Sequence, residues 1–383
     1  MKTMNFIIFF SVFFTIYGAI NYYIFIRGWQ ALPVHSNIRI IYLIVFLFIS
    51  LSFIAGRILE RIFLNSFTDI LVWVGSFWLA YMLYLLLFVI GLDLLRLVNH
   101  FFPFFKYFYS DYAKAKLVML YSVVGLSTLI ILIGHINSVY PGIKNLTIKI
   151  NKPAAVDSLT IAVASDIHLG TIINQRRFGR IVDKINSINP DVVLFPGDIV
   201  DEDLGPVIKE NLGEALLRIK SLYGVLAVTG NHEFIGGVEP ATKYLREHGV
   251  TVLRDSVLEI AGVQFVGRED RNITQFTGKH RKSIRDLLAA ANSQRPVILM
   301  DHQPFNLNEA VENNVDLQLS GHTHHGQLWP LNYITEAIYE VSWGYKKIGS
   351  THFYVSCGAG TWGPQARLGN RPEVLNIKVR FGK

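Results

Sequence analysis

The first 140 residues are dominated by four long apolar runs without a charged side chain. They lie between Lys2 and Arg27 and over residues 40–56, 70–92 and 117–143. Each is about as long as the roughly 17 to 25 residues that a helix needs to cross a bilayer. Buried helices of a soluble protein would show a polar face, and these runs have almost none. The pattern predicts four membrane-spanning helices, at about residues 4–26, 38–57, 69–92 and 117–138.

After Tyr140 the pattern changes to short apolar runs that alternate with amphipathic stretches. The apolar runs predict strands at residues 159–164, 191–195, 225–229, 263–266, 297–300, 316–319 and 353–356. The amphipathic stretches predict helices at residues 175–187, 207–222, 240–247 and 279–291. Strands that alternate with helices indicate a layered α/β domain, which we place at residues 150–383, with the helices outside the sheets.

The amino-acid composition agrees with a chain whose first part faces lipid and whose second part faces water. The chain is 51% hydrophobic and 17% charged, with a mean hydropathy of +0.34, more apolar than an ordinary soluble protein. Residues 1–140 hold 9 Lys and Arg against 4 Asp and Glu, whereas residues 141–383 hold 27 against 25. Most of the net charge of +7 therefore lies beside the predicted span ends, which favours lipid headgroups over nucleic acid. The single cysteine, Cys357, excludes an internal disulfide and an all-cysteine metal site.

Charge does not decide which way the predicted spans face. Four spans place both termini on one side. The basic residues of that side are Lys2, Arg57, Arg61, Lys144, Lys149 and Lys152, and those of the other side are Arg27, Arg39, Arg96, Lys106, Lys114 and Lys116. Six against six leaves the orientation open. The aromatic segment 101–112 is either an interfacial segment or a hydrophobic loop that covers the helices.

Residues suited to metal binding follow the predicted strands. The blocks are Asp166-Ile167-His168, Gly197-Asp198, Gly230-Asn231-His232-Glu233, Asp301-His302 and Gly321-His322-Thr323-His324-His325. In an α/β domain the carboxyl ends of the strands converge on one site. In an extended backbone Asp166 and His168 would project to the same side, and so would His322 and His324, because side chains alternate along a strand. The glycines before Asp198, Asn231 and His322 would allow sharp turns and a close approach of the backbone.

The chemistry of these residues narrows the choice of metal. Two carboxylates, one amide oxygen and four imidazoles, without a thiolate, suit Mn, Fe, Zn or Co better than Ca or Cu(I). Seven ligands are too many for one tetrahedral ion, but they fit two ions that share a carboxylate. Such a pair activates a water and clamps a phosphoryl group during an in-line displacement.

The ordered blocks DxH, GD, GNHE, H and GHTH resemble the calcineurin-like metallophosphoesterase superfamily over about residues 159–381. The resemblance implies a double β-sandwich flanked by helices (αββα), which hydrolyses phosphomonoesters or diesters at a dinuclear centre, with Mn as the first expectation. It implies two ions that share one carboxylate: Asp166, His168 and His324 for the first, Asn231, His302 and His322 for the second, and Asp198 between them. It also implies that His232 acts as a general acid while a metal-bridging hydroxide attacks.

The block at residues 321–327 is similar to the bacterial membrane-associated branch, as is the tail with residues 358–363, which include Trp362, with Arg367 and with Pro372-Glu373. Some members of that branch and its relatives cleave lipid-linked substrates such as a UDP-diacylglucosamine. Asn231, Arg367 and His325 are the candidate substrate-binding residues. A phosphate contact and a surface ion pair both remain open for Arg367. His325, where the branch commonly has glycine, either faces solvent or supports neighbouring ligands, or it binds metal. Glu233 is expected to orient His232 or to cap a turn.

The sequence predicts a membrane-anchored, dinuclear metal phosphoesterase that acts on a phospholipid or a lipid-linked phosphate. We expect a multi-pass protein of a bacterial inner membrane with the catalytic domain in the cytoplasm, and no nucleic-acid partner. The aromatic-rich segment 328–345 suits an interface, although a core helix with a loop would give the same pattern. Two alternatives are the same hydrolase on a soluble ester with the spans as a tether, and a transport or sensing module with a regulatory domain.

Overall fold

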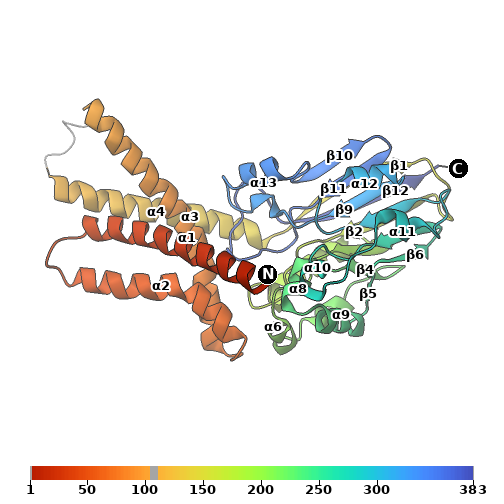
Figure 1. The fold of residues 1–383 in the computed structure, drawn as a ribbon, viewed down its shortest axis with the longest axis horizontal. Helices are drawn as coiled ribbons and strands as arrows, with labels where there is room; N and C mark the ends of the chain where they lie inside the picture. Colours follow the sequence, from red (N-terminus) through yellow and green to blue (C-terminus); the bar gives the residue numbers. More distant parts are fainter. Residues whose placement is uncertain (1, 104–110, 383) are drawn as a thin grey trace. The chain divides into compact units, whose positions relative to one another are not determined.

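The computed structural model describes residues 2–103 and 111–382 and divides the chain into two units (Figure 1). The first covers Met1–Ile133 and the second Gly134–Lys383. The division falls inside a helix, so the last turn of that helix belongs to the second unit. The interfacial segment expected at residues 101–112 lies largely outside the described residues.

The first unit consists of helices. They are α1 (Lys2–Ala31), α2 (Ile38–Glu60), α3 (Ser66–Phe101) and α4 (Tyr112–Val139), the last of which continues into the second unit. Among the described residues, α2, α3 and α4 are long and apolar enough to cross a membrane. The side chains of the first residues of α1 lie outside the described part, so three of the four predicted spans are supported. Helices α2 and α3 approach closely, because a Cβ on Gly75 would lie 2.3 Å from the backbone of Phe53.

The second unit is built on two six-stranded sheets. The strands of the first sheet, in spatial order, are β1 (Gly142–Ile150), β12 (Glu373–Phe381), β2 (Ser158–Val163), β3 (Val192–Pro196), β4 (Val225–Val228) and β5 (Val250–Val252). Those of the second are β10 (Gly344–Ile348), β11 (Thr351–Val355), β9 (Leu317–Ser320), β8 (Val297–Met300), β7 (Val263–Gly267) and β6 (Ser256–Ile260). Strands β2 to β5 are parallel, as are β7, β8, β9 and β11.

The main core lies between the two sheets. Ile161 and Leu194 from the first sheet pack in one cluster with Phe265 and Ile298 from the second. A second cluster joins the other face of β7 and β8 to α11 (Ile284–Leu288) and α12 (Asn308–Glu312). The predicted α/β domain with helices outside the sheets is therefore confirmed.

The helix predictions are correct in part. Helix α5 occupies Gln175–Ser187, as predicted, and α9 (Val238–Glu247) contains the helix predicted at 240–247. The predicted helix 207–222 is wrong as a single element, because the chain forms α6 (Leu204–Lys209) and α7 (Gly213–Leu217). Asn211, between them, has a φ of 50°, which interrupts a right-handed helix. The helix predicted at 279–291 is limited to α11.

Candidate active site

The candidate ligands lie in the loops that follow five strands. Asp166 and His168 follow β2, Asp198 follows β3, Asn231 follows β4, His302 follows β8, and His322 and His324 follow β9. The first sheet thus supplies four of the seven and the second sheet supplies three. The structure brings them together at the carboxyl ends of both sets of parallel strands.

The backbone reaches this arrangement in a different way from the one predicted. The extended conformation expected for residues 166–168 is wrong, because Asp166 and His168 have φ values of 52° and 55°. His322 and His324 also have positive φ, at 71° and 46°. A left-handed conformation is unfavourable for residues other than glycine and persists only when the surroundings hold it. Local strain therefore aims these side chains into the site.

The glycines beside the ligands have two distinct roles. Gly197, with a φ of 89°, makes the turn before Asp198. A Cβ on Gly230 would lie 2.1 Å from the Asp198 Oδ1 atom, and a Cβ on Gly321 would lie 2.0 Å from the Asp166 Oδ2 atom. These two glycines leave the space that the carboxylates fill.

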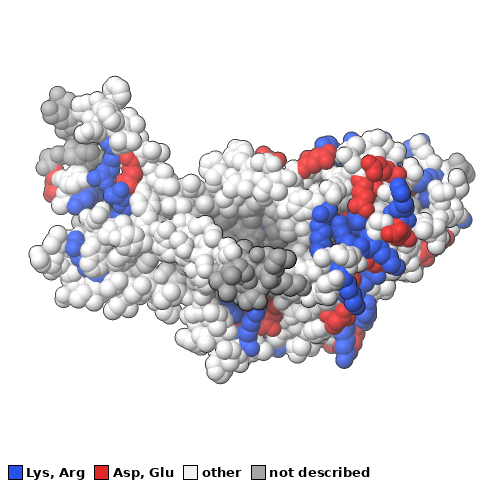
Figure 2. Space-filling view, in the orientation of Figure 1, with Lys and Arg blue, Asp and Glu red and all other residues white. Residues whose placement is uncertain are grey.

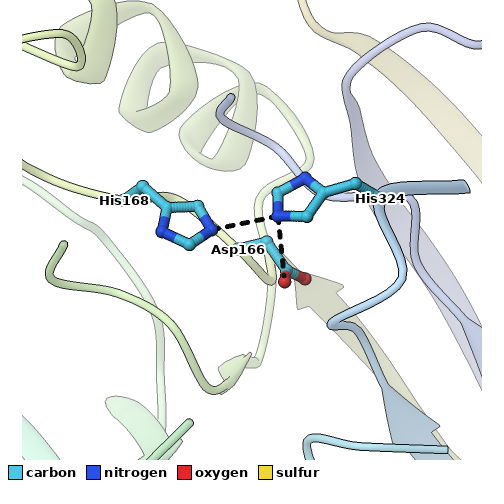
Figure 3. A group of neighbouring side chains, drawn as sticks. All are labelled: Asp166, His168 and His324. Atoms are coloured by element: carbon cyan, nitrogen blue, oxygen red, sulfur yellow. Dashed lines mark hydrogen bonds and ion pairs between the residues drawn. The ribbon is translucent and has the colours of Figure 1, made fainter. Parts of the chain in front are cut away.

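The first metal-binding group contains Asp166, His168 and His324 (Figure 3). The Nε2 atoms of His168 and His324 are 3.0 Å apart, and the His324 Nε2 atom lies 3.6 Å from the Asp166 Oδ1 atom. Ser165 donates a 2.6 Å hydrogen bond to Asp166 Oδ2, and the His322 backbone N–H donates to Asp166 Oδ1. The carboxylate is thereby fixed with the two imidazoles facing it.

The second group contains Asp198, His302 and His322. The Asp198 Oδ2 atom lies 3.1 Å from His302 Nε2 and 3.9 Å from His168 Nε2. The Asn231 Oδ1 atom lies 2.7 Å from His322 Nδ1 and 3.2 Å from His302 Nε2. Asp198 also forms a group with His168 and His232, so its carboxylate stands between the two sets, as a bridging ligand must.

Two of these histidines are neutral, as metal ligands must be. Burial lowers the pKa of His322 to about 3 and that of His324 well below its ordinary value, so both rings are neutral and carry a free lone pair. The His302 Nδ1 atom lies 2.8 Å from the Pro196 carbonyl oxygen, and its Nε2 atom faces Asp198 Oδ2 at 3.1 Å. Burial opposes the charged ring, but Asp198 raises the pKa of His302 well above its ordinary value, and a divalent ion would take the place of the proton on Nε2. Buried carboxylates and imidazole lone pairs that converge in this way fit a pair of divalent ions.

His232 lies beside the ligands and has an acidic partner of its own. Its Nδ1 atom is 3.1 Å from Asp201 Oδ1, and its ring packs edge-on against His168 with ring centroids 4.5 Å apart. Burial opposes the charged ring, but Asp198, Asp201 and Glu202 together raise the pKa of His232 to about 9. A protonated imidazole held in this way can donate a proton to a leaving oxygen.

Glu233 organises the loop of Asp198 and caps the next helix. Its carboxylate accepts hydrogen bonds from the backbone N–H groups of Ile199, Val200 and Gly230 at 2.7 to 2.9 Å, and from that of Asp198 at 3.2 Å. Gly230 precedes α8 (Asn231–Gly236), so this contact is the reciprocal half of a capping box. Of the two roles expected for Glu233, the structure shows the cap.

Arg367 is fully buried and lies behind a metal ligand. Its guanidinium donates to the carbonyl oxygens of Cys357 and Gly360, and its Nη2 atom lies 3.0 Å from the His324 Nδ1 atom. The backbone N–H of Arg367 donates to Gly134 O in the last turn of α4. Its Nη1 and Nη2 groups thus meet acceptors of the chain itself rather than the surface, and Nη2 lies beside the His324 ring.

His325 points to a neighbouring segment. Its Nδ1 atom lies 3.0 Å from the Ser342 hydroxyl and its ring packs on Trp343. It belongs to none of the metal-binding groups found in the described part of the chain.

Sequence reasoning gave no role to two residues at this site. Asp201 holds His232, and the Trp362 ring lies 5.5 Å from the His232 ring, measured between centroids. The signal for Asp201 was its place three residues after Asp198, in the same loop. Trp362 lies in a glycine-rich segment, and the pattern of apolar and polar residues does not predict where such a segment lies in the fold.

Comparison with known proteins agrees with this geometry. The model of the calcineurin-like phosphoesterase family matches residues 159–326. A metallophosphoesterase of Helicobacter pylori strain J99 is 32% identical over 244 residues, covering 62% of this chain and 64% of that protein. Another from a second H. pylori strain is 30% identical over 290 residues, covering 72% of this chain and 76% of that protein. A Danio rerio transmembrane protein with a metallophosphoesterase domain is 29% identical over 254 residues, covering 63% and 57%.

The family match contains all seven candidate ligands, from Asp166 to His324. The match to the second H. pylori protein extends well beyond this region, over most of both chains. The chain therefore belongs to the calcineurin-like metallophosphoesterases, a family of metal-dependent phosphoester hydrolases.

Proposed function

We propose that this protein is a membrane-anchored phosphoesterase that hydrolyses a phosphodiester or pyrophosphate bond in a lipid-linked substrate. A lipid-linked substrate is supported by an exposed apolar surface beside the candidate ligands. It is formed by α13 (Asn332–Ile338), none of whose residues is buried, and by its flanks. The exposed side chains are Trp329, Tyr333, Ile334, Ile338 and Trp343, with fractions from 37% to 60%.

This apolar surface adjoins the candidate ligands. The Tyr339 ring, directly after α13, lies 6.1 Å from the His322 ring between centroids, and the Trp343 ring packs on His325. A contiguous exposed apolar surface marks a binding or membrane contact. Acyl chains held there would place the attached phosphate near the ligands, whereas a soluble ester would gain nothing from it.

The roles of the residues follow from their geometry. Two divalent ions, with Mn as the first candidate, would supply an activated water and charge to clamp the phosphoryl group. The carboxylates and imidazoles described above would hold them, with Asp198 between the two. His232, kept protonated and oriented by Asp201, would give its proton to the leaving oxygen. Trp362 would close one side of the space in front of His232.

We extend the proposal to the membrane. Helix α1 would add a fourth span to α2, α3 and α4, and both termini would then lie in the cytoplasm of a bacterial cell. The name of the zebrafish relative as a transmembrane protein supports a membrane location. The competing function is hydrolysis of a soluble ester, with the membrane spans serving only as a tether.

The test compares two substrates on the full-length chain. Tyr333→Ser with Ile334→Ser and Ile338→Ser removes apolar surface without touching a ligand. We expect at least a tenfold fall in kcat/KM on a vesicle-embedded phosphodiester lipid, because each buried CH₂ contributes roughly 0.8 kcal/mol. Turnover of a small soluble diester should not change. Leu222→Ser, at a side chain 71% exposed on the same unit, is the matched control. An equal effect on both substrates, or none on the lipid, would favour the tether.

A further inference from the structure

The helical unit contains a partly open cavity of about 870 Å³, none of whose lining residues belongs to the candidate metal centre. Side chains of α1, α2, α3 and α4 line it, and most of them are apolar or aromatic, among them Phe46, Trp73, Phe77, Trp78 and Leu85. The volume lies in the range of roughly 300 to 1,000 Å³ that is usual for ligand sites. Its apolar walls fit a hydrocarbon chain.

The charged residues that line the cavity come from one end of the unit. They are Arg27, Arg39, Asp93, Arg96 and Lys116. Arg27 and Arg96 stand near the ends of α1 and α3, whereas Arg39 and Lys116 stand near the starts of α2 and α4. Figure 2 shows basic and acidic atoms gathered at one end of the helical unit. The cavity therefore has one polar end.

This polar end carries more positive charge than the chain neutralises. Asp93 is the single acid among the lining residues, against four cations. Its Oδ2 atom lies 2.5 Å from Arg27, and its Oδ1 atom 3.6 Å from Arg96. Arg39 and Lys116 donate to backbone carbonyl oxygens, at 2.9 and 3.1 Å, which carry no full charge. An anion is needed to balance these groups.

Two donors at this end also lack an acceptor. The Nε atoms of Arg27 and Arg39 are buried, and neither has a hydrogen-bond partner in the described part of the chain. A buried donor without a partner is costly, and guanidinium groups pair well with phosphate oxygens because they present several N–H groups in one plane. A phosphate at this point would satisfy both the charge and the donors.

We propose that the cavity binds one anionic phospholipid, with its phosphate among Arg27, Arg39, Arg96 and Lys116 and an acyl chain against the aromatic wall. A soluble anion would leave the apolar walls without a ligand, and we therefore infer that the occupant is a lipid. Lys116 stands near the start of α4, and the chain enters the second unit at the other end of that helix. The cavity shares no residue with the candidate metal centre, and the proposal does not depend on the substrate.

The test measures lipid retained by the purified full-length protein. Native mass spectrometry follows protein exchanged into an equal mixture of dioleoyl-phosphatidylglycerol and dioleoyl-phosphatidylcholine, which share their acyl chains. We expect one phosphatidylglycerol per chain. Arg39→Gln with Lys116→Gln should lower its retention roughly tenfold or more, since each basic group at a lipid surface contributes measurably. Lys114→Gln with Arg61→Gln removes the same charge outside the cavity and should change nothing.

Two further variants separate binding in the cavity from an effect of charge alone and from binding at the metal centre. Val89→Trp fills the cavity without altering charge and should also exclude the lipid. Asp198→Ala, at the metal centre, should leave retention unchanged, which separates this site from the hydrolytic one. Equal retention of both lipids, an equal loss in the control variant, or displacement by excess inorganic phosphate would each overturn the proposal.

Discussion

Five of the seven candidate ligands have a strained, left-handed backbone conformation, and the geometry of the site depends on it. Asp166, His168, Asp198, His322 and His324 all have positive φ, from 46° to 71°. Such conformations are held by the fixed surroundings, here by the hydrogen bonds of Glu233 and by the glycines against which the carboxylates pack. Small changes in these surroundings should displace ligands without touching them.

A methyl group at Gly230 tests this dependence. Gly230→Ala would place a Cβ 2.1 Å from Asp198 Oδ1, so the carboxylate must move. We expect loss of bound metal with the second unit still folded, measured by metal analysis together with circular dichroism. Gly179→Ala, where the nearest atom would be 3.8 Å away, is the control. Full metal content in Gly230→Ala would contradict the proposed position of Asp198.

The acid role that we propose for His232 depends on its protonated ring. His232→Ala should keep its metal and lose roughly 10² to 10⁴ in rate on substrates with poor leaving groups. A nitrophenolate leaving group needs no proton and should recover much of the rate. Equal loss on both kinds of substrate would remove the assignment.

The pH dependence follows from the partners of His232. Asp201 helps to raise the pKa of His232 to about 9, so the acid form persists until pH rises through that value. Asp201→Asn removes this contribution, lowers the pKa, and should move the alkaline limb of the kcat profile to lower pH. Asp203→Asn, at the N-cap of α6, is a control outside the site. An unmoved alkaline limb in Asp201→Asn would show that another group sets it.

Among the strands, the apolar runs of the sequence predicted those that are buried and missed those that are half exposed. Strands β3, β4 and β8 are buried at every residue and appear as continuous apolar runs. β1 and β6 alternate or carry exposed residues. β1 also pairs with β12, more than 220 residues away, which local pattern cannot reveal. The helix predicted at 207–222 failed for a local reason, the left-handed Asn211.

Strand β1 should contribute to stability although it joins the domain at its edge. Ile148 and Ile150 are buried in the core between the sheets. Ile148→Ala should lower the free energy of unfolding of the second unit by roughly 2 to 5 kcal/mol, from lost burial and the cavity left behind. Denaturant unfolding would measure this, with Ile143→Ala, at a side chain 38% exposed on the same strand, as the control. A change no larger than that of the control would contradict the packing of β1.

In the whole molecule, the candidate ligands lie together where the sequence predicted, because each follows a strand that is recognisable by itself. The sequence could not place the groups behind them. Arg367 reaches His324 from a loop far along the chain, and its contact depends on the complete fold. Likewise, the apolar runs predicted helices, but only their packing showed the cavity and its charged end.

The proposed function requires a centre of two divalent ions with Asp198 between them. The most direct measurement is the metal content of the purified full-length protein after supplementation with Mn, compared with Asp198→Ala and with Asp183→Ala, an exposed carboxylate on α5. We predict two ions per chain in the wild type and in Asp183→Ala, and a large loss in Asp198→Ala, because both ions lose an anionic ligand. One ion or none in the wild type, or two ions retained in Asp198→Ala, would contradict the account.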